Sequence, residues 1–524
     1  MTGGTVTFFP SFLNFLAFPI PKLTYSSVPM ITLALALLLA APAAEPSLDS
    51  VVHQVKLNNG MTWLLVRREA APVFSAYWRV RAGGVDEHPG ITGLAHLFEH
   101  MAFKGTAQIG TRDFAAEAPL LAHVTEVGDA LSRERAKGDK AAPNELARLE
   151  KSLAEAQAAE AKFIVKDELS DLYQRNGAVG LNATTDKDLT SYFVSFPKNR
   201  LQLWARTEAA RFSAPVLREF YSERDVVTQE RRMRVDASPV GRLNEQLTLT
   251  AFSLSPQRWP GVGTLADLAT LKSSDALEFY QKYYTPANAV GAIVGDIDLE
   301  ATTRLLESTF GAVPEGPVPA PPRDERWDRA QDGERRVRVE FDAEPIVEVA
   351  WHKPTLPARD DYVFDALEIL LTEGPTSRLY RSLVLEKRLV QGVGTFQTGG
   401  GRLDNLFTVA AAPLKPHTSA DVLAAIDTEV EKLQQKPVDA RELQRVLNHL
   451  EVNLAREVAS NEGLASALSY YEALAGDWHY LTEHRKVLQT ITPADVQRAA
   501  QTYLVRNNRT VAELVRPAKT EGAR

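Results

Sequence analysis

The sequence predicts an α+β fold made of two related domains, and three observations carry this prediction. Apolar residues alternate from Val51 onward on both sides of a turn signal at 58–60, Asn-Asn-Gly, which predicts a β-hairpin. A helix–turn–strand pattern occurs twice, beginning at Asp275 and again at Asp495. Between the two copies, the proline-rich stretch 311–325 is typical of a linker.

The two copies of this pattern match at four positions without gaps. The first reads DALEFYQKYYTPANAV and the second reads DVQRAAQTYLVRNNRT. Both have the order helix, turn, strand, which indicates that an α+β domain has been duplicated. The matching pairs are Asp275 with Asp495, Gln281 with Gln501, Tyr283 with Tyr503, and Asn288 with Asn508.

The chain is long enough for several domains, because 524 residues exceed what one hydrophobic core usually holds. A third strand is expected at 73–80, and a strand at 289–298 with the helix after it closes the first domain. The expected order is an export signal and N-terminal extension at 1–44, a first domain at 45–310, a linker at 311–334, a second domain at 335–517 and a tail at 518–524.

Residues 113–175 are rich in alanine, glutamate and leucine and differ from their surroundings. The pattern breaks once, at 136–144, so it predicts a helical hairpin arm inserted into the first domain. The charges of this arm indicate a solvated face, with a partner-binding surface as the alternative. The apolar positions with the spacing of a packed helix are Leu146, Leu149, Leu153 and Ala156.

Composition excludes several classes of function. The net charge of −8 and the absence of a strongly basic half argue against nucleic acid as a partner. There is no cysteine, so disulfides, thiolate catalysis and cysteine-bound zinc are excluded. Any metal ion must therefore be held by histidine, aspartate or glutamate.

An apolar run at 30–44, MITLALALLLAAPAA, predicts an export signal. The run is too short to span a bilayer as a helix and ends in small residues, with cleavage expected near Ala43 or Ala44. The mature chain would then have no stable membrane span. The alternative is an uncleaved hydrophobic anchor.

The stretch GLAHLFEHMAFKGT holds two of the ten histidines, four residues apart. On a helix, His96 and His100 lie on one face, and Glu99 points the same way. Two imidazoles from adjacent turns are suitable zinc ligands, and a carboxylate beside them can take a proton from a zinc-bound water. The spacing His-x-x-Glu-His is a named catalytic motif. The alternative is an ordinary polar helix face.

Three segments in the same order resemble the pitrilysin/insulinase family of zinc metallopeptidases, closest to its bacterial, processing-peptidase-like branch. They are HLFEHMAFKGT, LNATTDKDLTSYF at 181–193 and ERDVVTQERR at 223–232, and the resemblance extends from about Val51 to Pro517. It implies two domains, each an antiparallel-rich sheet with helices packed on one face, which together enclose a chamber. Together with the export signal, the resemblance to bacterial members predicts a periplasmic protein.

The family resemblance assigns the remaining site residues. Glu230 would be the third ligand of one zinc ion per chain, and Glu223, two helical turns earlier, would orient a histidine ligand. Glu99 would activate the zinc-bound water for attack on the scissile carbonyl. Asn182 and Ala183 would present backbone groups of an edge strand to an extended peptide, although an ordinary strand turn is the alternative.

The chain departs from the family pattern in its second half. Single-chain relatives supply there an arginine and, seven residues later, a tyrosine that help to stabilise the oxyanion. Here those positions align with Val384 and Gln391, while Tyr380, Arg381 and Arg388 are nearby but out of register. A related, zinc-less partner subunit is therefore expected to complete the site in a heterodimer.

The sequence thus predicts a zinc-dependent endopeptidase that cleaves peptides or unfolded polypeptides. The gap from His100 to Glu230 is longer than in short relatives, and the arm accounts for it without moving the ligands. A peptide-binding protein or a structural assembly subunit with little turnover of its own is the alternative.

Overall fold

The computed structural model describes residues 48–322 and 331–517. Contacts divide the chain into two compact units, 1–52 and 53–524. Of the first unit the structure describes helix α1 (Leu48–Val51) and the first residue of the next strand. The predicted export signal and C-terminal tail therefore lie outside the described residues. None of the described helices combines the length and apolar character that crossing a bilayer requires.

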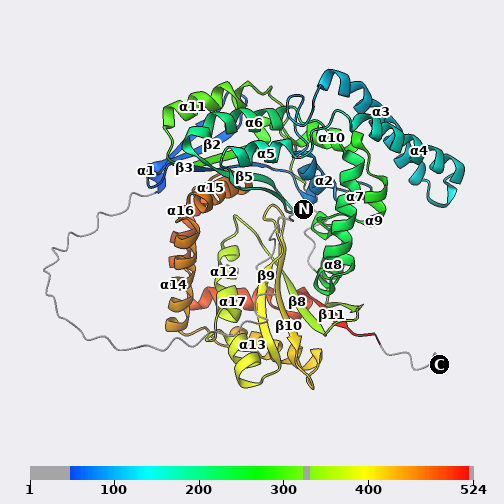
Figure 1. The fold of residues 1–524 in the computed structure, drawn as a ribbon. Helices are drawn as coiled ribbons and strands as arrows, with labels where there is room; N and C mark the ends of the chain where they lie inside the picture. The colour runs from blue at the N-terminus through cyan, green and yellow to red at the C-terminus, as the bar shows by residue number, and fades with distance from the viewer. Residues whose placement is uncertain (1–47, 323–330, 518–524) are drawn as a thin grey trace, which may run out of the picture. The chain divides into compact units, whose positions relative to one another are not determined.

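The first half contains a six-stranded sheet with the order β1-β2-β6-β3-β5-β4 (Figure 1). β6 pairs with β2 in parallel and with β3 antiparallel, and β5 pairs antiparallel with both β3 and β4. The predicted hairpin and the predicted strand at 73–80 are confirmed. The strand expected at 289–298 ends earlier, where Gly295 turns the chain with a φ of +150°. The strands are β1 (Val52–Lys56), β2 (Thr62–Arg67), β3 (Val73–Val80), β4 (Val179–Thr185), β5 (Thr190–Pro197) and β6 (Ala289–Gly295).

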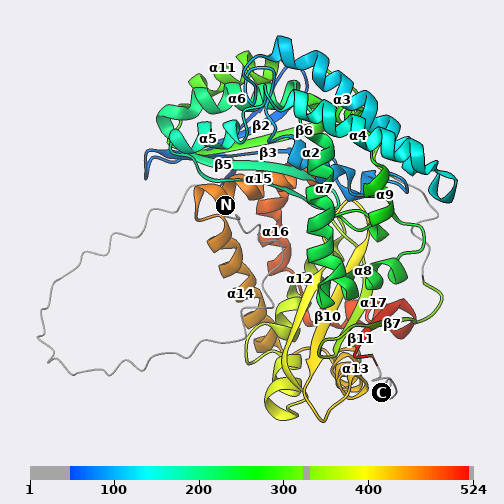
Figure 2. The same ribbon diagram turned by 45° about the vertical axis from the view of Figure 1, so that its right-hand side comes forward.

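Helices of the first half cover one side of this sheet, with α6 and α11 over its middle (Figures 1 and 2). The core between them is strongly aromatic, and the rings of Trp63 and Trp204 meet edge to face at 5.8 Å. The helices are α2 (Leu94–Met101), α6 (Leu201–Ser213), α7 (Phe220–Arg231), α8 (Pro239–Ala251), α9 (Leu265–Thr270), α10 (Ser273–Tyr283) and α11 (Leu299–Ser308).

The segment 113–175 forms α3 (Phe114–Arg135), α4 (Pro143–Glu160) and α5 (Glu168–Arg175). α3 and α4 pack against each other along their length and project from the first half (Figure 2). The leucine positions that suggested helix packing lie in this contact, since Leu149 and Leu153 are buried. The arm is anchored on α7 through the C-terminal half of α3, because Gly128 touches the ring of Tyr221.

The second half repeats the topology of the first. Its sheet has the order β7-β11-β8-β10-β9, with β7 and β11 parallel and the other pairs antiparallel. This is the arrangement β2-β6-β3-β5-β4 of the first sheet in the same chain order. The strands are β7 (Arg335–Glu340), β8 (Ile346–Lys353), β9 (Val390–Gln397), β10 (Asn405–Pro413) and β11 (Arg509–Val515). The helices are α12 (Arg359–Thr372), α13 (Ser419–Gln435), α14 (Ala440–Glu457), α15 (Asn461–Ala475), α16 (Tyr480–Gln489) and α17 (Pro493–Tyr503).

The residues that match between the two halves make the same local hydrogen bonds. The side-chain amide of Asn288 donates to the carbonyl of Tyr283 at 2.8 Å, and Asn508 donates to that of Tyr503 at 2.9 Å. Each asparagine therefore links the end of a helix to the start of the strand after it. The sequence match reflects a shared turn, and the duplicated α+β fold is confirmed.

Each half also lends one helix to the other. α15, from the second half, packs on β3 and β6 of the first sheet, on the side away from α6 and α11 (Figures 1 and 2). α8, from the first half, packs on β7 and β11 of the second sheet. Each half therefore includes a helix from the other part of the sequence. The domain boundaries expected from the sequence remain a proposal.

A single methyl group at Gly128 should loosen the packing of α3 on α7. A Cβ built there would lie 2.0 Å from Cε2 of Tyr221, so Gly128→Ala forces α3 away from α7. We expect a loss of about 1–3 kcal/mol in the free energy of unfolding, as for other overpacked sites. Urea denaturation measures it.

Gly261→Ala is the matched control, because a Cβ there meets nothing within 4 Å. Its unfolding curve should overlay that of the unchanged chain. Equal stability of both variants would contradict the tight contact between α3 and α7.

Candidate metal centre

Helix α2 carries the predicted metal-binding motif and is buried on nearly every side. Its N-cap residue is Gly93, whose φ of +88° is readily adopted by glycine. The side chain of Glu87 accepts hydrogen bonds from the backbone N–H groups of Gly93 and Ala95, both at 2.8 Å, so a carboxylate caps the helix N-terminus. Burial raises the pKa of Glu87 to about 8, although these hydrogen bonds act in the opposite direction.

The three predicted ligands lie together. The Nε2 atoms of His96 and His100 are each 3.6 Å from Oε2 of Glu230, which α7 brings against α2. Within the described residues, this is the one group of three histidine or acidic side chains whose donor atoms all lie within 4.8 Å of one another. Tetrahedral zinc bonds of about 2.0–2.1 Å place ligand atoms roughly 3.3 Å apart, so the arrangement fits a zinc ion after a small contraction.

The other predicted carboxylate on α7 also contacts this group. Oε2 of Glu223 lies 3.3 Å from Nδ1 of His100, on the side of the ring opposite Glu230. Lys104, just after α2, pairs with Glu223 and also with Glu219 at 3.3 Å. The glutamates two turns apart thus reach both ends of one imidazole, and Lys104 holds the outer one in place.

Glu99 points to the same region and is hydrogen-bonded from a strand. The hydroxyl of Thr185, the last residue of β4, donates to Oε2 of Glu99 at 2.6 Å. Burial raises the pKa of Glu99 to about 7, and the hydrogen bond from Thr185 limits this rise. Sequence reasoning did not assign a role to Thr185, although the residue lies within the quoted segment LNATT.

The two histidines have different electrostatic surroundings. Burial, together with the neighbouring His100 and Arg234, lowers the pKa of His96 to about 3. Burial also acts to lower the pKa of His100, but its hydrogen bond to Glu223 and the nearby carboxylates outweigh this effect and raise it. Nδ1 of His96 is buried without a hydrogen-bond partner in the described structure.

Asn182 and Ala183 lie on β4, which is the edge strand of the first sheet. They pair with Phe193 and Tyr192 of β5, beyond an irregularity in the register after Val179. The side chain of Asn182 accepts a hydrogen bond from the N–H of Ala183 at 2.9 Å. A peptide that paired with this N–H would have to displace the asparagine side chain.

The positions aligned with the family's arginine and tyrosine have other side chains and other surroundings. Val384 packs against the core of the second half, and Tyr380 does the same. Gln391 is exposed on β9, the edge strand of the second sheet. No described contact joins these three residues to the group on α2 and α7.

Comparison with known proteins agrees with this architecture. The profile described as "Insulinase (Peptidase family M16)" matches residues 64–123, and "Peptidase M16 inactive domain" matches residues 270–450. The "Zinc protease PqqE" of Helicobacter pylori is 26% identical over 457 residues, which cover 86% of this chain and 90% of that protein. An "Uncharacterized zinc protease" of Streptomyces coelicolor is 22% identical over 434 residues and 81% of each chain.

Solved structures show the same fold. A protease from Helicobacter pylori superposes with a TM-score of 0.74 at 24% identity, over 89% of this chain and 99% of that one. The first half of the periplasmic protease PqqL from Escherichia coli gives 0.64 at 17% identity, over 88% and 92%. The fold is thus that of the two-domain M16 peptidases. The chain belongs to the pitrilysin/insulinase family, and its named relatives are zinc proteases.

Removing the ammonium group of Lys104 should weaken metal binding without abolishing it. Lys104→Met frees Glu223 from its cation and loosens the carboxylate that contacts His100. Loss of such an outer contact typically costs about 10–100-fold in metal affinity, and we expect the lower end of this range. Competition with a zinc chelator measures the affinity.

Lys166→Met serves as the control, because it removes a charge near the same Glu219 from an exposed side chain. Its zinc affinity should be unchanged. If both variants bound zinc like the unchanged chain, Lys104 would have no part in ordering the site.

Proposed function

We propose that this chain is a zinc-dependent endopeptidase that hydrolyses peptides or unfolded polypeptides. The observation that carries the proposal is the convergence of both Nε2 atoms on one oxygen of Glu230, with Glu99 on the same helix. His96, His100 and Glu230 would hold one zinc ion per chain. All four residues are those that the family resemblance names.

Glu99 has the position of a general base. A zinc ion held by its neighbours would supply Lewis acidity that lowers the pKa of a water molecule. Glu99 would take a proton during attack on the scissile carbonyl and return it to the leaving amine. Thr185 would keep the carboxylate directed toward the reaction, and Glu223 would hold the ring of His100 in the orientation that binding requires.

The substrate would bind in extended form along β4. An edge strand offers unpaired backbone groups to a further strand, and Asn182 and Ala183 would contribute theirs. Val179, near the start of β4, is 71% exposed, so the strand is accessible there. The chamber between the halves stays a prediction; such an enclosure would favour short or unfolded peptides over folded proteins.

A related partner subunit without zinc would complete the site. Val384 and Gln391 stand where single-chain relatives have the arginine and tyrosine, and their side chains lack a cation and a phenol. The match of residues 270–450 to an inactive domain supports a division of labour between related units. We also infer export to the periplasm, the location given for the similar PqqL of Escherichia coli.

One observation favours a second candidate function. A chain without the arginine and tyrosine could hold peptides for a partner and cleave little by itself. The complete set of His96, His100, Glu230 and Glu99 weighs against this reading, because a binding or assembly subunit has no need of a metal centre with an adjacent base.

Glu99→Gln separates the two functions. The amide keeps the size of the side chain but cannot take a proton, so we expect turnover to fall by about 10²–10⁴-fold. Zinc content should stay near that of the unchanged chain, because Glu99 is not among the proposed ligands. The measurements are metal analysis and cleavage of an unstructured peptide.

Glu126→Gln is the control, since this glutamate is exposed on the arm. It should leave turnover unchanged. Full activity of Glu99→Gln would exclude the proposed base, and unchanged peptide binding with no turnover in any form would favour the second candidate.

The partner proposal predicts a rate that depends on a second subunit. The purified chain alone should bind zinc but cleave an unstructured peptide slowly, and adding a related zinc-less subunit should raise kcat. A titration of the partner at fixed chain concentration measures this. Full turnover by the chain alone would show that the second half needs no partner to complete the site.

A further inference from the structure

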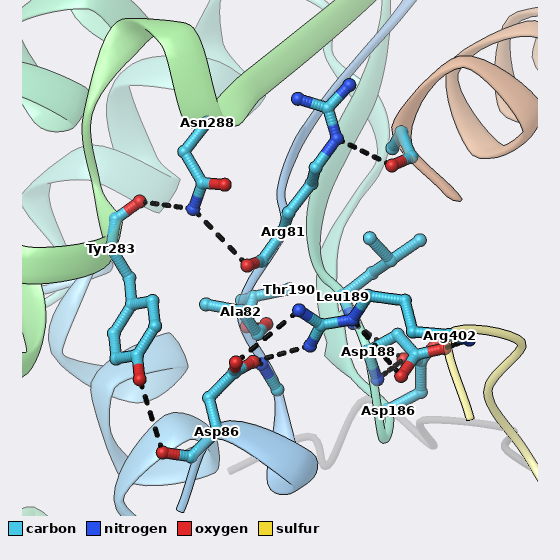
Figure 3. Close-up of polar contacts among 12 residues, drawn as sticks. Arg81, Ala82, Asp86, Asp186, Asp188, Leu189, Thr190, Tyr283, Asn288 and Arg402 are labelled. Atoms are coloured by element: carbon cyan, nitrogen blue, oxygen red, sulfur yellow. Dashed lines mark hydrogen bonds and ion pairs between the residues drawn. The ribbon is translucent and has the colours of Figure 1, made fainter. Parts of the chain in front are cut away.

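The loop between β9 and β10 reaches from the second half into the first. Its sequence at 398–404, TGGGRLD, places an arginine after three glycines. Figure 3 shows the guanidinium group of Arg402 between the carboxylates of Asp86 and Asp188, both from the first half. The proposed function gives this contact no role.

Arg402 is held by ion pairs to two carboxylates and by backbone hydrogen bonds of its loop. Its guanidinium pairs with Asp86, with Nη2 2.5 Å from Oδ2, and its Nε lies 3.3 Å from Oδ1 of Asp188. The backbone N–H groups of Gly401 and Arg402 both donate to the other oxygen of Asp188, that of Arg402 at 2.8 Å. The side chains of Asp86 and Asp188 are only 2% and 1% exposed. Removing one partner would leave a buried charge uncompensated, which is strongly unfavourable.

The glycines let the loop approach this closely. A Cβ on Gly400 would lie 2.9 Å from Cβ of Lys187, and the φ of this glycine is +96°. A Cβ on Gly401 would lie 2.7 Å from Cδ2 of Leu474. The loop is therefore shaped to place Arg402 against the first half.

Asp188, one of the two carboxylates that contact Arg402, belongs to the turn between β4 and β5. Within this turn Asp186 accepts hydrogen bonds from the backbone N–H groups of Asp188 and Leu189, at 2.7 and 2.8 Å. The residue directly before the turn is Thr185, whose hydroxyl donates to Glu99. The position of the turn therefore sets the end of β4 and the contact to Glu99.

Asp86, the other carboxylate that contacts Arg402, lies next to the residue that caps the N-terminus of α2. Asp86 is followed by Glu87, which accepts from the N-terminus of α2. The segment before it is tied to the same turn, since the N–H groups of Gly84 and Val85 donate to carbonyls of 186–187. The side chain of Arg402 thus supports both α2, which carries Glu99, and β4, whose last residue Thr185 contacts Glu99.

We propose that Arg402 is a positioning residue for the peptidase site, which fixes the β4–β5 turn so that Thr185 holds Glu99 and the edge of β4 stays aligned for substrate. This inference rests on the proposed function. It assigns the second half a part in the reaction that does not depend on a partner subunit. Arginine suits the role because its planar fork contacts two carboxylates at once, whereas lysine presents one compact charge.

The test compares Arg402→Met and Arg402→Lys with Arg68→Met. Arg68 also joins the halves, through hydrogen bonds to the carbonyls of 458–460 at 3.0 to 3.2 Å, but it touches neither the turn nor α2 in any described contact. Each variant is measured for zinc affinity, melting temperature, kcat and KM, at a temperature well below the lowest melting point. Exchange of backbone amide hydrogens in 179–197 reports on the turn directly.

We expect Arg402→Met to keep zinc affinity within about twofold, to lower kcat at least tenfold and to raise KM, with faster amide exchange in the turn. Arg402→Lys should recover part of kcat. Arg68→Met should lower the melting temperature without changing kcat. If Arg402→Met does not fold, Asp188→Asn removes the charge from the other side and should give the same loss of kcat.

An equal effect of Arg402→Met and Arg68→Met on kcat would reduce Arg402 to a structural contact and overturn the proposal. Unchanged amide exchange in the turn would overturn it as well. If the unchanged chain cleaves no peptide even with its partner, the proposed function fails. Faster exchange in Arg402→Met alone would then still support the positioning of the turn.

Discussion

The packing of α7 against α2 is the contact on which the site depends. It brings the carboxylate of Glu230 to the two imidazoles of α2 and places Glu223 behind one of them. Helix periodicity explains why each helix presents its pair on one face, since residues three, four and seven apart are neighbours. The rest of the first half supports this contact: α3 of the arm meets Tyr221 of α7, and the cap by Glu87 fixes the start of α2.

Duplication explains the architecture and also the asymmetry of its chemistry. The two sheets share strand order, and both helix–strand turns use the same asparagine-to-carbonyl hydrogen bond. Helix α12 follows β8 as α2 follows β3, yet it carries neither histidine of the motif. The second half therefore contributes structure to the site: α15 covers the first sheet, and Arg402 reaches the turn beside Glu99.

Much of the fold could be predicted from the sequence because it follows from local patterns. Alternation predicted the first hairpin and β3, and the repeated pattern predicted the duplication. The exchange of α8 and α15 could not be predicted, since an amphipathic helix does not indicate which sheet it will cover. For the same reason, the end of one domain and the start of the next are not separable by composition alone.

The site residues also divide into those that local patterns predict and those that depend on contacts between distant segments. His96, Glu99 and His100 follow from spacing on one helix, whereas Glu230 and Glu223 needed the family resemblance because they lie on another helix. Thr185, Lys104 and Glu87 went unassigned, since each acts through a contact between distant segments. For two of them the sequence position was a signal, because Lys104 lies in the motif segment and Thr185 in the segment assigned to substrate binding.

X-ray absorption spectroscopy on the zinc-loaded chain tests the central claim most directly. We expect a zinc shell of nitrogen and oxygen atoms at about 2.0–2.2 Å with the outer scattering of two imidazoles, and no sulfur. His100→Ala should then show one imidazole, and Glu230→Gln should lose a carboxylate oxygen. A spectrum with fewer than two imidazoles in the unchanged chain, or one that neither substitution alters, would contradict the proposed centre on α2 and α7.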